Sequence, residues 1–151
     1  MKQPRAPYHL PAKPEPDLTR VRAYWEGLKR GGNEIPFWDD VKLSALPKHS
    51  ARMASIDVFE KPLRFRFGIV GRELRKRYGK SLEGKFADDI GRGDPFDYLG
   101  SQCHATVESG TPTYYRHEPG TKAGRKSGYA RLLLPLWGDG HISMLLCAAV
   151  W

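Results

Sequence analysis

The C-terminal quarter of the chain predicts two long strands that are apolar on both faces. Residues 128–137 and 141–150 are rich in aliphatic side chains, and Gly138-Asp139-Gly140 between them is a hairpin signal. One face carries Ala130, Leu132, Leu134, Leu136, Ile142, Met144, Leu146 and Val150. The other carries Tyr129, Leu133, Trp137, Leu145, Cys147 and Trp151. A sheet with two apolar faces needs a cover on both sides.

Three more strands are predicted earlier in the chain. Residues 53–59 and 64–70 flank a Lys61-Pro62 turn, which predicts an antiparallel hairpin, and residues 113–117 form a short strand. The 64–70 segment alternates, so we expect one face to carry the apolar side chains and the other the polar ones. The expected apolar face consists of Phe65, Phe67 and Ile69, and the opposite face of Arg64, Arg66 and Gly68.

The helices that could cover this sheet have their own signals. Asp17 is placed to cap a helix over residues 17–30, and Gly31-Gly32 is placed to end it. Its apolar stripe is formed by Leu18, Val21, Tyr24, Trp25 and Leu28. A basic helix is predicted over 71–78, and a longer one over 95–109, capped by Asp94 or Asp97, with Phe96, Leu99, Cys103 and Val107 on one face. We expect the 17–30 helix to cover one side of the sheet, alone or exchanged with a second subunit, and the middle helices to cover the other.

The order of elements predicts an α+β domain with a five-stranded antiparallel sheet. The 151 residues are enough for one domain with a core and too few for two of ordinary size. Prolines at positions 4, 7, 11, 14 and 16 make residues 1–16 an extended arm, which leaves residues 17–151 as the domain.

This order of elements, with the phrase Tyr-Gly-Lys-Ser-Leu-Glu-Gly-Lys-Phe-Ala-Asp-Asp-Ile at 78–90, resembles a PAS domain. Residues 17–151 are similar to a family of short bacterial PAS-like proteins. The matching segments are Tyr24-Trp25 with Gly31-Gly32, residues 65–71, 78–86 and 131–136, and Asp139-Gly140 with 144–146. The resemblance implies a cytoplasmic sensory or signalling module that binds a small ligand or a protein partner and forms a dimer. Because no Ser/His/Asp or Cys/His arrangement can be assembled from the sequence, we expect that it is not an enzyme. A third and weakest reading is an enzyme on a related cone-shaped α+β fold, which would need paired acidic residues in a cavity. Because no kinase, cyclase or helix-turn-helix segment follows in the sequence, we expect a stand-alone module.

A PAS-like fold implies a ligand pocket between the sheet and the middle helices, mostly apolar with a few polar groups. The side chains expected to line it are Phe67, Ile69, Tyr78, Leu82, Phe86, Ile90, Phe96, Leu99, Cys103, Tyr115, Leu134 and Met144. The alternative is that these residues fill a core and that the domain acts through protein contacts alone. The residues expected at a protein interface, or beneath the covering helix, are Leu18, Val21, Trp25, Leu28, Trp137 and Leu145, with Trp151 beside them.

The sequence contains no strong signal for a cofactor or a metal. The cysteine that flavin photochemistry needs after the second strand is absent, and the five histidines lack zinc-ligand spacing. Gly79-Lys80-Ser81 lacks the upstream glycine of a phosphate loop. Cys103 and His104 lie on the helix that often supplies the haem ligand in PAS domains, so haem is kept as a weak alternative to a core cysteine beside a surface histidine.

Charge supplies a second functional hypothesis. The net charge is +8, and residues 61–92 hold ten basic residues against four acidic ones. A basic adaptor for nucleic acid or an anionic surface would use Arg64, Arg66, Arg72, Arg75, Lys76 and Arg77. We weigh this below the sensory module, because charge alone often marks a solvated face. Residues 116–131 are also basic.

The sequence predicts a reduced, cytoplasmic setting. No apolar stretch reaches the length of a membrane span, and no secretory signal is visible. The two cysteines, Cys103 and Cys147, lack CxxC spacing.

Overall fold

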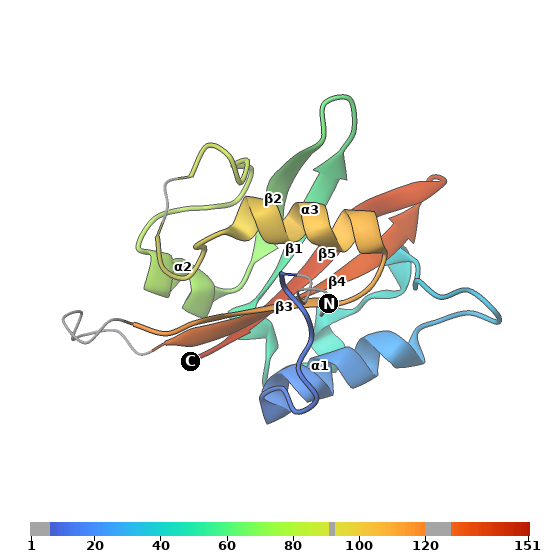
Figure 1. Ribbon diagram of the computed structural model, residues 1–151, viewed down its shortest axis with the longest axis horizontal. Coiled ribbons are helices and arrows are strands. Elements are labelled where there is room, and N and C mark those ends of the chain that lie inside the picture. Colours follow the sequence, from blue (N-terminus) through green and yellow to red (C-terminus); the bar gives the residue numbers. More distant parts are fainter. Residues whose placement is uncertain (1–6, 91–92, 120–127) are drawn as a thin grey trace, which may run out of the picture.

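The computed structural model describes residues 7–90, 93–119 and 128–151, in which five antiparallel strands form one sheet (Figure 1). The strands are β1 (Met53–Phe59), β2 (Arg64–Val70), β3 (Thr113–His117), β4 (Tyr129–Gly138) and β5 (His141–Val150), in the order β2-β1-β5-β4-β3. The helices are α1 (Pro16–Gly27), α2 (Arg72–Tyr78) and α3 (Leu99–Ser109), with the short 3₁₀ turns Trp38–Asp40, Leu43–Ala45 and Ser50–Arg52. The α+β class and the antiparallel sheet are confirmed.

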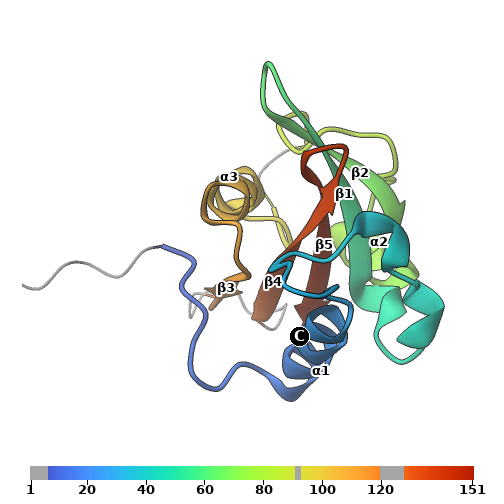
Figure 2. The same ribbon diagram turned by 90° about the vertical axis from the view of Figure 1, so that its right-hand side faces the viewer.

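The sheet is covered on both sides. One apolar cluster joins it to α2, α3 and the segment between them, and a second joins it to α1 (Figures 1 and 2). The first contains Ala54, Ile56, Val58, Phe65, Phe67, Val70, Leu74, Leu82, Phe96, Leu99, Cys103, Leu133, Leu145, Cys147 and Ala149. The second contains Leu18, Val21, Trp25, Leu46, Met53, Ala130, Leu132, Leu134, Leu136, Leu146 and Ala148. Alternation along β4 and β5 therefore divides the two long strands between two cores.

The ends of two helices differ from the prediction. α1 begins at Pro16, which suits the first helical position because its missing N–H needs no partner there, and Asp17 lies in the first turn instead of capping it. It ends at Gly27 rather than near residue 30. α3 begins at Leu99, four residues later than expected, since Tyr98 has a φ of 58°, in the left-handed region that a right-handed helix excludes.

The expected alternation of β2 was wrong at Ile69. The register between β1 and β2 shifts between Ala54 and Ile56, so Val70 becomes buried and Ile69 is 63% exposed. The amide of Ile69 donates to Ser55 Oγ at 2.9 Å in place of a regular strand partner. A similar shift between Leu136 and Trp137 places Ile142 against the cluster under α2 and α3, not with Met144 as predicted. A bulge reverses the face of every residue beyond it.

Both edge strands carry additional chain along their outer side. Residues 84–87 run beside β2, where the amide of Phe67 donates to Lys85 O (2.9 Å) and the amide of Ala87 donates to Phe65 O (2.7 Å). Beside β3, the amide of Tyr114 donates to Tyr8 O at 3.0 Å, so part of the proline-rich arm lies against the sheet. Covering an edge in this way restricts strand-to-strand association with other chains.

Across the described ranges, no helix combines the length and the apolar character needed to cross a bilayer.

Candidate functional site

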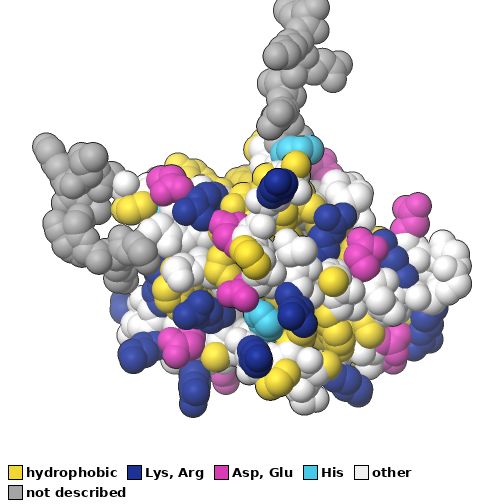
Figure 3. Space-filling view, turned by 90° about the horizontal axis from the view of Figure 1, so that it is seen from below, with side chains coloured by type: hydrophobic (Ala, Val, Ile, Leu, Met, Phe, Trp, Pro, Cys, Tyr) yellow, Lys and Arg dark blue, Asp and Glu magenta, His cyan; other side chains and the backbone are white. Residues whose placement is uncertain are grey.

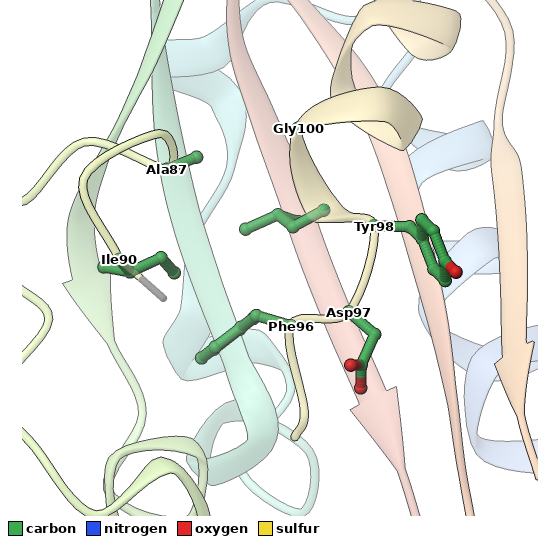
Figure 4. A pocket seen from close by; sticks show the side chains of 7 residues that line it. Ala87, Ile90, Phe96, Asp97, Tyr98 and Gly100 are labelled. Carbon is green, nitrogen blue, oxygen red and sulfur yellow. The ribbon is translucent and has the colours of Figure 1, made fainter. Parts of the chain in front are cut away.

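A depression opens where α3 begins, between this helix and the segment that follows β2 (Figure 4). Its volume is about 250 Å³, and it is lined by Ala87, Ile90, Phe96, Asp97, Tyr98, Leu99 and Gly100. Figure 4 shows Ala87, Ile90 and Phe96 directed into the space, whereas the side chains of Asp97 and Tyr98 point away from it. The walls that a ligand would touch are therefore mainly apolar.

The floor of the depression continues into the core. The ring of Phe96 meets Phe67 edge to face, with centroids 5.1 Å apart, and Tyr78 at 5.5 Å. Leu82 and Cys103 belong to the same buried cluster. These residues fill the interior, so the space that remains for a ligand lies at the border of the core and not at its centre.

The wall of the depression is fastened to β4 by a buried arginine. Arg131 is 0% exposed, and its guanidinium donates from Nη1 to Pro95 O (3.0 Å) and from Nη2 to Asp97 O (2.8 Å). Its Nε donates to Oε1 of Gln102 on α3 at 2.8 Å. Buried arginines usually face a carboxylate, because removing a charge from water is costly. Among the described residues, the guanidinium instead donates to carbonyl and amide oxygens, and the ring of Tyr115 lies 5.0 Å from it.

Tyr129, two residues before Arg131 on the same face of β4, holds the same segment by a second route. Its hydroxyl donates to Asp97 Oδ2 at 2.6 Å and accepts the amide hydrogen of Asp97 at 3.1 Å. Burial and the bond to Asp97 raise the pKa of Tyr129, so the phenol stays protonated and remains a donor. His117 stacks on its ring at 5.2 Å.

The polar contacts continue beneath α3. The side-chain amide of Gln102 donates to Thr113 Oγ1 at 3.1 Å, and the hydroxyls of Thr106 and Thr113 lie 2.6 Å apart. Gln102, Thr106 and Thr113 are all buried. The network therefore joins α3, β3, β4 and the segment before α3 inside the protein, and such satisfied buried networks favour one arrangement of the elements they join.

Most of the predicted pocket residues lie together. Phe67, Leu82, Phe96, Leu99 and Cys103 are in the cluster under α2 and α3, and Tyr78 and Ile90 pack against it. Phe86 is partly buried, with Arg64 over its ring at 3.8 Å. Tyr115 lies in a group of aromatic rings with Tyr8, Tyr98 and Tyr129.

Three predicted pocket residues lie elsewhere. Ile69 is exposed, for the reason given above. Leu134 and Met144 were placed on the wrong side of the sheet, since Leu134 belongs to the cluster under α1 and Met144 packs against that cluster. The apolar runs of β4 and β5 show two faces, but nothing in either run identifies which helix covers which face.

The α1 side chains that were predicted to form an interface pack against the sheet of the same chain. Leu18, Val21 and Trp25 are buried against the sheet, and the Trp25 indole N–H donates to Pro135 O at 2.8 Å. Leu28 follows the end of α1 and is partly exposed. Trp137 contacts the segment before the first 3₁₀ turn, where its amide donates to Pro36 O. Leu145 was assigned to the wrong face, because it lies in the cluster on the far side of the sheet from α1.

Sequence reasoning missed Arg131 as a site residue and used it only as part of the family resemblance. One signal was available. Arg131 interrupts the otherwise apolar run of β4, and a charge at an inward-facing position must find buried partners. Tyr129 and Gln102 could not have been identified in this way, because their partners come from segments distant in sequence.

Four of the six basic side chains proposed for a nucleic-acid surface pair with acidic side chains. Arg64 pairs with Asp88, Arg66 with Asp57, Arg75 with Glu83 and Arg77 with Asp94. On the α1 side of the molecule, which Figure 3 shows from below, Lys and Arg side chains are likewise interspersed with Asp, Glu and apolar groups. Part of the second basic segment, residues 120–127, lies outside the described residues. Asp57 and Asp94 lie outside residues 61–92, so they make the positive field of this surface smaller than the composition of that segment suggests.

Cys103 and His104 occupy opposite environments. Cys103 is enclosed in the core, where burial raises the pKa of its thiol, and His104 is exposed with its ring against Phe65. The His104 imidazole does not enter the interior, so this pair does not fit a haem ligand set. Within the part of the chain that the structure describes, no three His, Cys, Asp or Glu side chains gather as metal ligands.

Comparison of the chain with protein-family models, with curated proteins and with solved structures finds no match.

Proposed function

We propose that the chain is a PAS-like sensory module of the bacterial cytoplasm. It binds a small, mainly apolar ligand at the start of α3 and regulates a protein partner by interaction, without catalysing a reaction. The observation that carries this proposal is the attachment of the depression's wall. Pro95 and Asp97 belong to the segment that forms this wall, and both are hydrogen-bonded to β4. Arg131 donates to the carbonyl oxygens of Pro95 and Asp97, and Tyr129 donates to the Asp97 carboxylate. The resemblance of residues 17–151 to short PAS-like proteins supports the same function.

The size and lining of the depression limit the ligand. A volume of about 250 Å³ is at the small end for ligand sites, which commonly exceed about 300 Å³. Ala87, Ile90, Phe96 and Leu99 offer apolar contact. A neutral compound of about one ring in size fits this chemistry better than a charged metabolite, which would lose its hydration against these side chains.

β4 is the element through which occupancy of the site would be transmitted. Arg131 and Tyr129 hold the wall from one face of the strand, and Leu132, Leu134 and Leu136 pack under α1 from the other. A ligand that favours one position of the Pro95–Tyr98 segment therefore shifts the environment of β4 and α1 together. A homodimer would have to use another surface than the α1 stripe, since that stripe is buried in its own chain.

Two measurements test the proposal. Native mass spectrometry of protein purified from its own host should show a bound small molecule, and a fragment library should shift the NMR amide signals of residues 87–90 and 96–100. Gly100→Leu should abolish these shifts, because Gly100 lines the depression and a leucine side chain has open space there to occupy it. Gly27→Leu, at an equally open position on α1, is the matched control and should leave binding unchanged. No bound molecule, together with fragment shifts that persist in Gly100→Leu, would contradict the proposal.

A further inference from the structure

The N-terminal arm lies along the outer edge of β3. Besides the bond from the Tyr114 amide to Tyr8 O, the ring of Tyr8 lies 6.2 Å from that of Tyr115. The hydroxyl of Tyr114 donates to the Glu15 carboxylate, at 2.8 Å to Oε1, and the guanidinium of Arg116 pairs with the same carboxylate. The arm therefore supplies an aromatic ring and an acidic group to this edge.

The arm is nevertheless a poor partner for a strand. Pro7, Pro11 and Pro14 have no N–H to donate, so the arm cannot continue the hydrogen-bond ladder of the sheet. Among the described residues, the Tyr8–Tyr114 contact is the single main-chain bond between the arm and β3. A hollow of about 770 Å³ also separates the arm from α3, and Tyr8, Leu10, Arg22, Glu108 and Pro112 are among its lining residues.

The opposite edge of the sheet is closed more completely. Phe67 exchanges two main-chain bonds with residues 84 and 85, and Ala87 adds a third to Phe65. Those bonds lie within the folded segment that leads to the depression. The arm can therefore dissociate from β3 with the loss of one main-chain hydrogen bond, whereas residues 84–87 would lose three on leaving β2.

We propose that the outer edge of β3 is a docking site for an extended segment of a protein partner, which adds beside β3 in place of the arm. The contacts of the arm define the chemistry of this partner. It carries an acidic side chain on the face of Tyr114 and Arg116, and an aromatic side chain over Tyr115. Without prolines, it makes the main-chain bonds that the arm lacks, and strand addition of this kind obtains affinity from the backbone and specificity from alternate side chains.

Charge supports an acidic segment as the occupant. The chain as a whole carries a net charge of +8, and Arg116 is an exposed cation that already holds two carboxylates, that of Glu15 in the arm and that of Glu118 just after β3. A segment with a basic residue at that position would place like charges opposite each other, which destabilises strand pairing. The inference rests on the partner-binding part of the proposed function and does not depend on a ligand in the depression.

The test uses the full chain and a fluorescein-labelled eight-residue peptide of alternating valine and threonine, with one tyrosine and one glutamate. A control peptide has lysine in place of glutamate, and a second has proline at alternate positions. Fluorescence anisotropy measures binding, and NMR locates it. We expect the glutamate peptide alone to bind and to shift the amides of residues 113–117. Glu15→Gln, which weakens the hold of the arm, should tighten binding about three- to tenfold.

Arg116→Glu provides the charge-reversed variant, at an exposed position where circular dichroism can verify folding. It should reverse the preference, so that the lysine peptide binds better than the glutamate peptide. Equal binding of the two peptides, shifts confined to residues outside 113–117, or self-association of Glu15→Gln without peptide binding would overturn the inference. The last outcome would identify a second copy of the chain as the occupant. A failure to find ligand binding at residues 87–100 would not change the expected peptide results. The ligand site at the start of α3 and the docking site at β3 can therefore be refuted independently of each other.

Discussion

Arg131 Nη2 donates to the carbonyl of Asp97 at 2.8 Å, which joins the start of β4 to the segment that precedes α3. The two residues are far apart in sequence, and the bond forms only when the sheet and α3 are assembled. The carboxylate of Asp97 accepts a hydrogen bond from Tyr129, whereas Arg131 binds the backbone carbonyl of Asp97. The segment is thus held at both its side chain and its main chain.

Arg131→Met should lower the free energy of unfolding by about 2–4 kcal/mol, because three acceptors, two buried and one part-buried, lose their donor while the apolar volume is roughly kept. Urea unfolding followed by circular dichroism measures this. Arg131→Lys should recover only part of the loss, since a lysine ammonium cannot reproduce the planar fork that reaches Pro95, Asp97 and Gln102. Wild-type stability in Arg131→Met would show that the guanidinium contacts contribute nothing net.

Tyr129→Phe removes one hydroxyl and keeps the ring. The bond to Asp97 Oδ2 and the bond from the Asp97 amide are both lost, so we expect a decrease of about 1–2 kcal/mol in the free energy of unfolding. Amide hydrogen exchange should accelerate at residues 96–99 more than elsewhere. Tyr24→Phe, which loses a hydroxyl bonded to Lys42 on the α1 side, is the control and should leave exchange at 96–99 unchanged. Uniform acceleration across the sheet would contradict a local role.

The strands were predictable because their signals are local. Four of the five have the predicted bounds, and β4 is displaced by one residue. The two apolar faces of β4 and β5 follow from period-two alternation, as does the need for two covers. The bulges beside Ile69 and Trp137 could not be predicted, because a bulge depends on the pairing of two strands and leaves little trace in either one.

The candidate site was predictable only in its apolar part. Phe96, Leu99 and Ile90 follow from the helix pattern and the family resemblance, and the structure brings them to one depression. The polar attachment of its wall depends on contacts between Arg131, Pro95 and Gln102, which no periodicity encodes. Assignment of Leu134, Met144 and Leu145 to the wrong side has the same origin: the pattern defines faces, and tertiary packing decides what covers them.

Gly71→Ala should be among the most destabilising single substitutions in the chain. Gly71 has an ordinary negative φ, so its need for glycine comes from space: a methyl group there would clash with the backbone carbonyl oxygens of Ser50 and Ala51. Backbone atoms cannot move aside cheaply, and we expect a loss of at least about 2 kcal/mol, measured by thermal and urea unfolding. Gly32→Ala, in open space without a positive φ, should change stability by less than about 0.5 kcal/mol. Equal effects of the two substitutions would contradict the close approach.

Trp25→Phe tests whether α1 is an integral cover of the sheet. The indole is buried and donates to Pro135 O, so its loss removes both volume and a hydrogen bond, at a cost of about 2 kcal/mol. Trp38→Phe, at a position 46% exposed, should cost much less. The measurement is urea unfolding of both variants, with sedimentation to record association. A dimer that appears in the wild type and disappears in Trp25→Phe would instead place this residue in an intermolecular interface.

Stability should fall as the pH rises above about 9. Burial raises the pKa of Cys147 from its ordinary value of 9.0 to about 11, and burial with the Glu15 bond raises the pKa of Tyr114 from 10.0 to about 12. In both cases the folded state keeps a proton that the unfolded state releases, so unfolding is favoured with increasing pH. Between pH 9 and 11 the thiol of Cys147 should remove about 1.4 kcal/mol per pH unit, and Tyr114 should add a smaller effect between pH 10 and 12.

Urea unfolding at intervals from pH 7 to 12 measures this dependence, with Tyr114→Phe as the matched variant. Its stability should decline less than that of the wild type above pH 10, and the two should run in parallel below it. Reaction of the native protein with a thiol reagent at pH 9 should be slow for the same reason, since Cys103 and Cys147 remain neutral and enclosed. Fast labelling at that pH, or a stability that rises with pH, would show that these thiols are accessible in the folded protein and that the core under α3 opens.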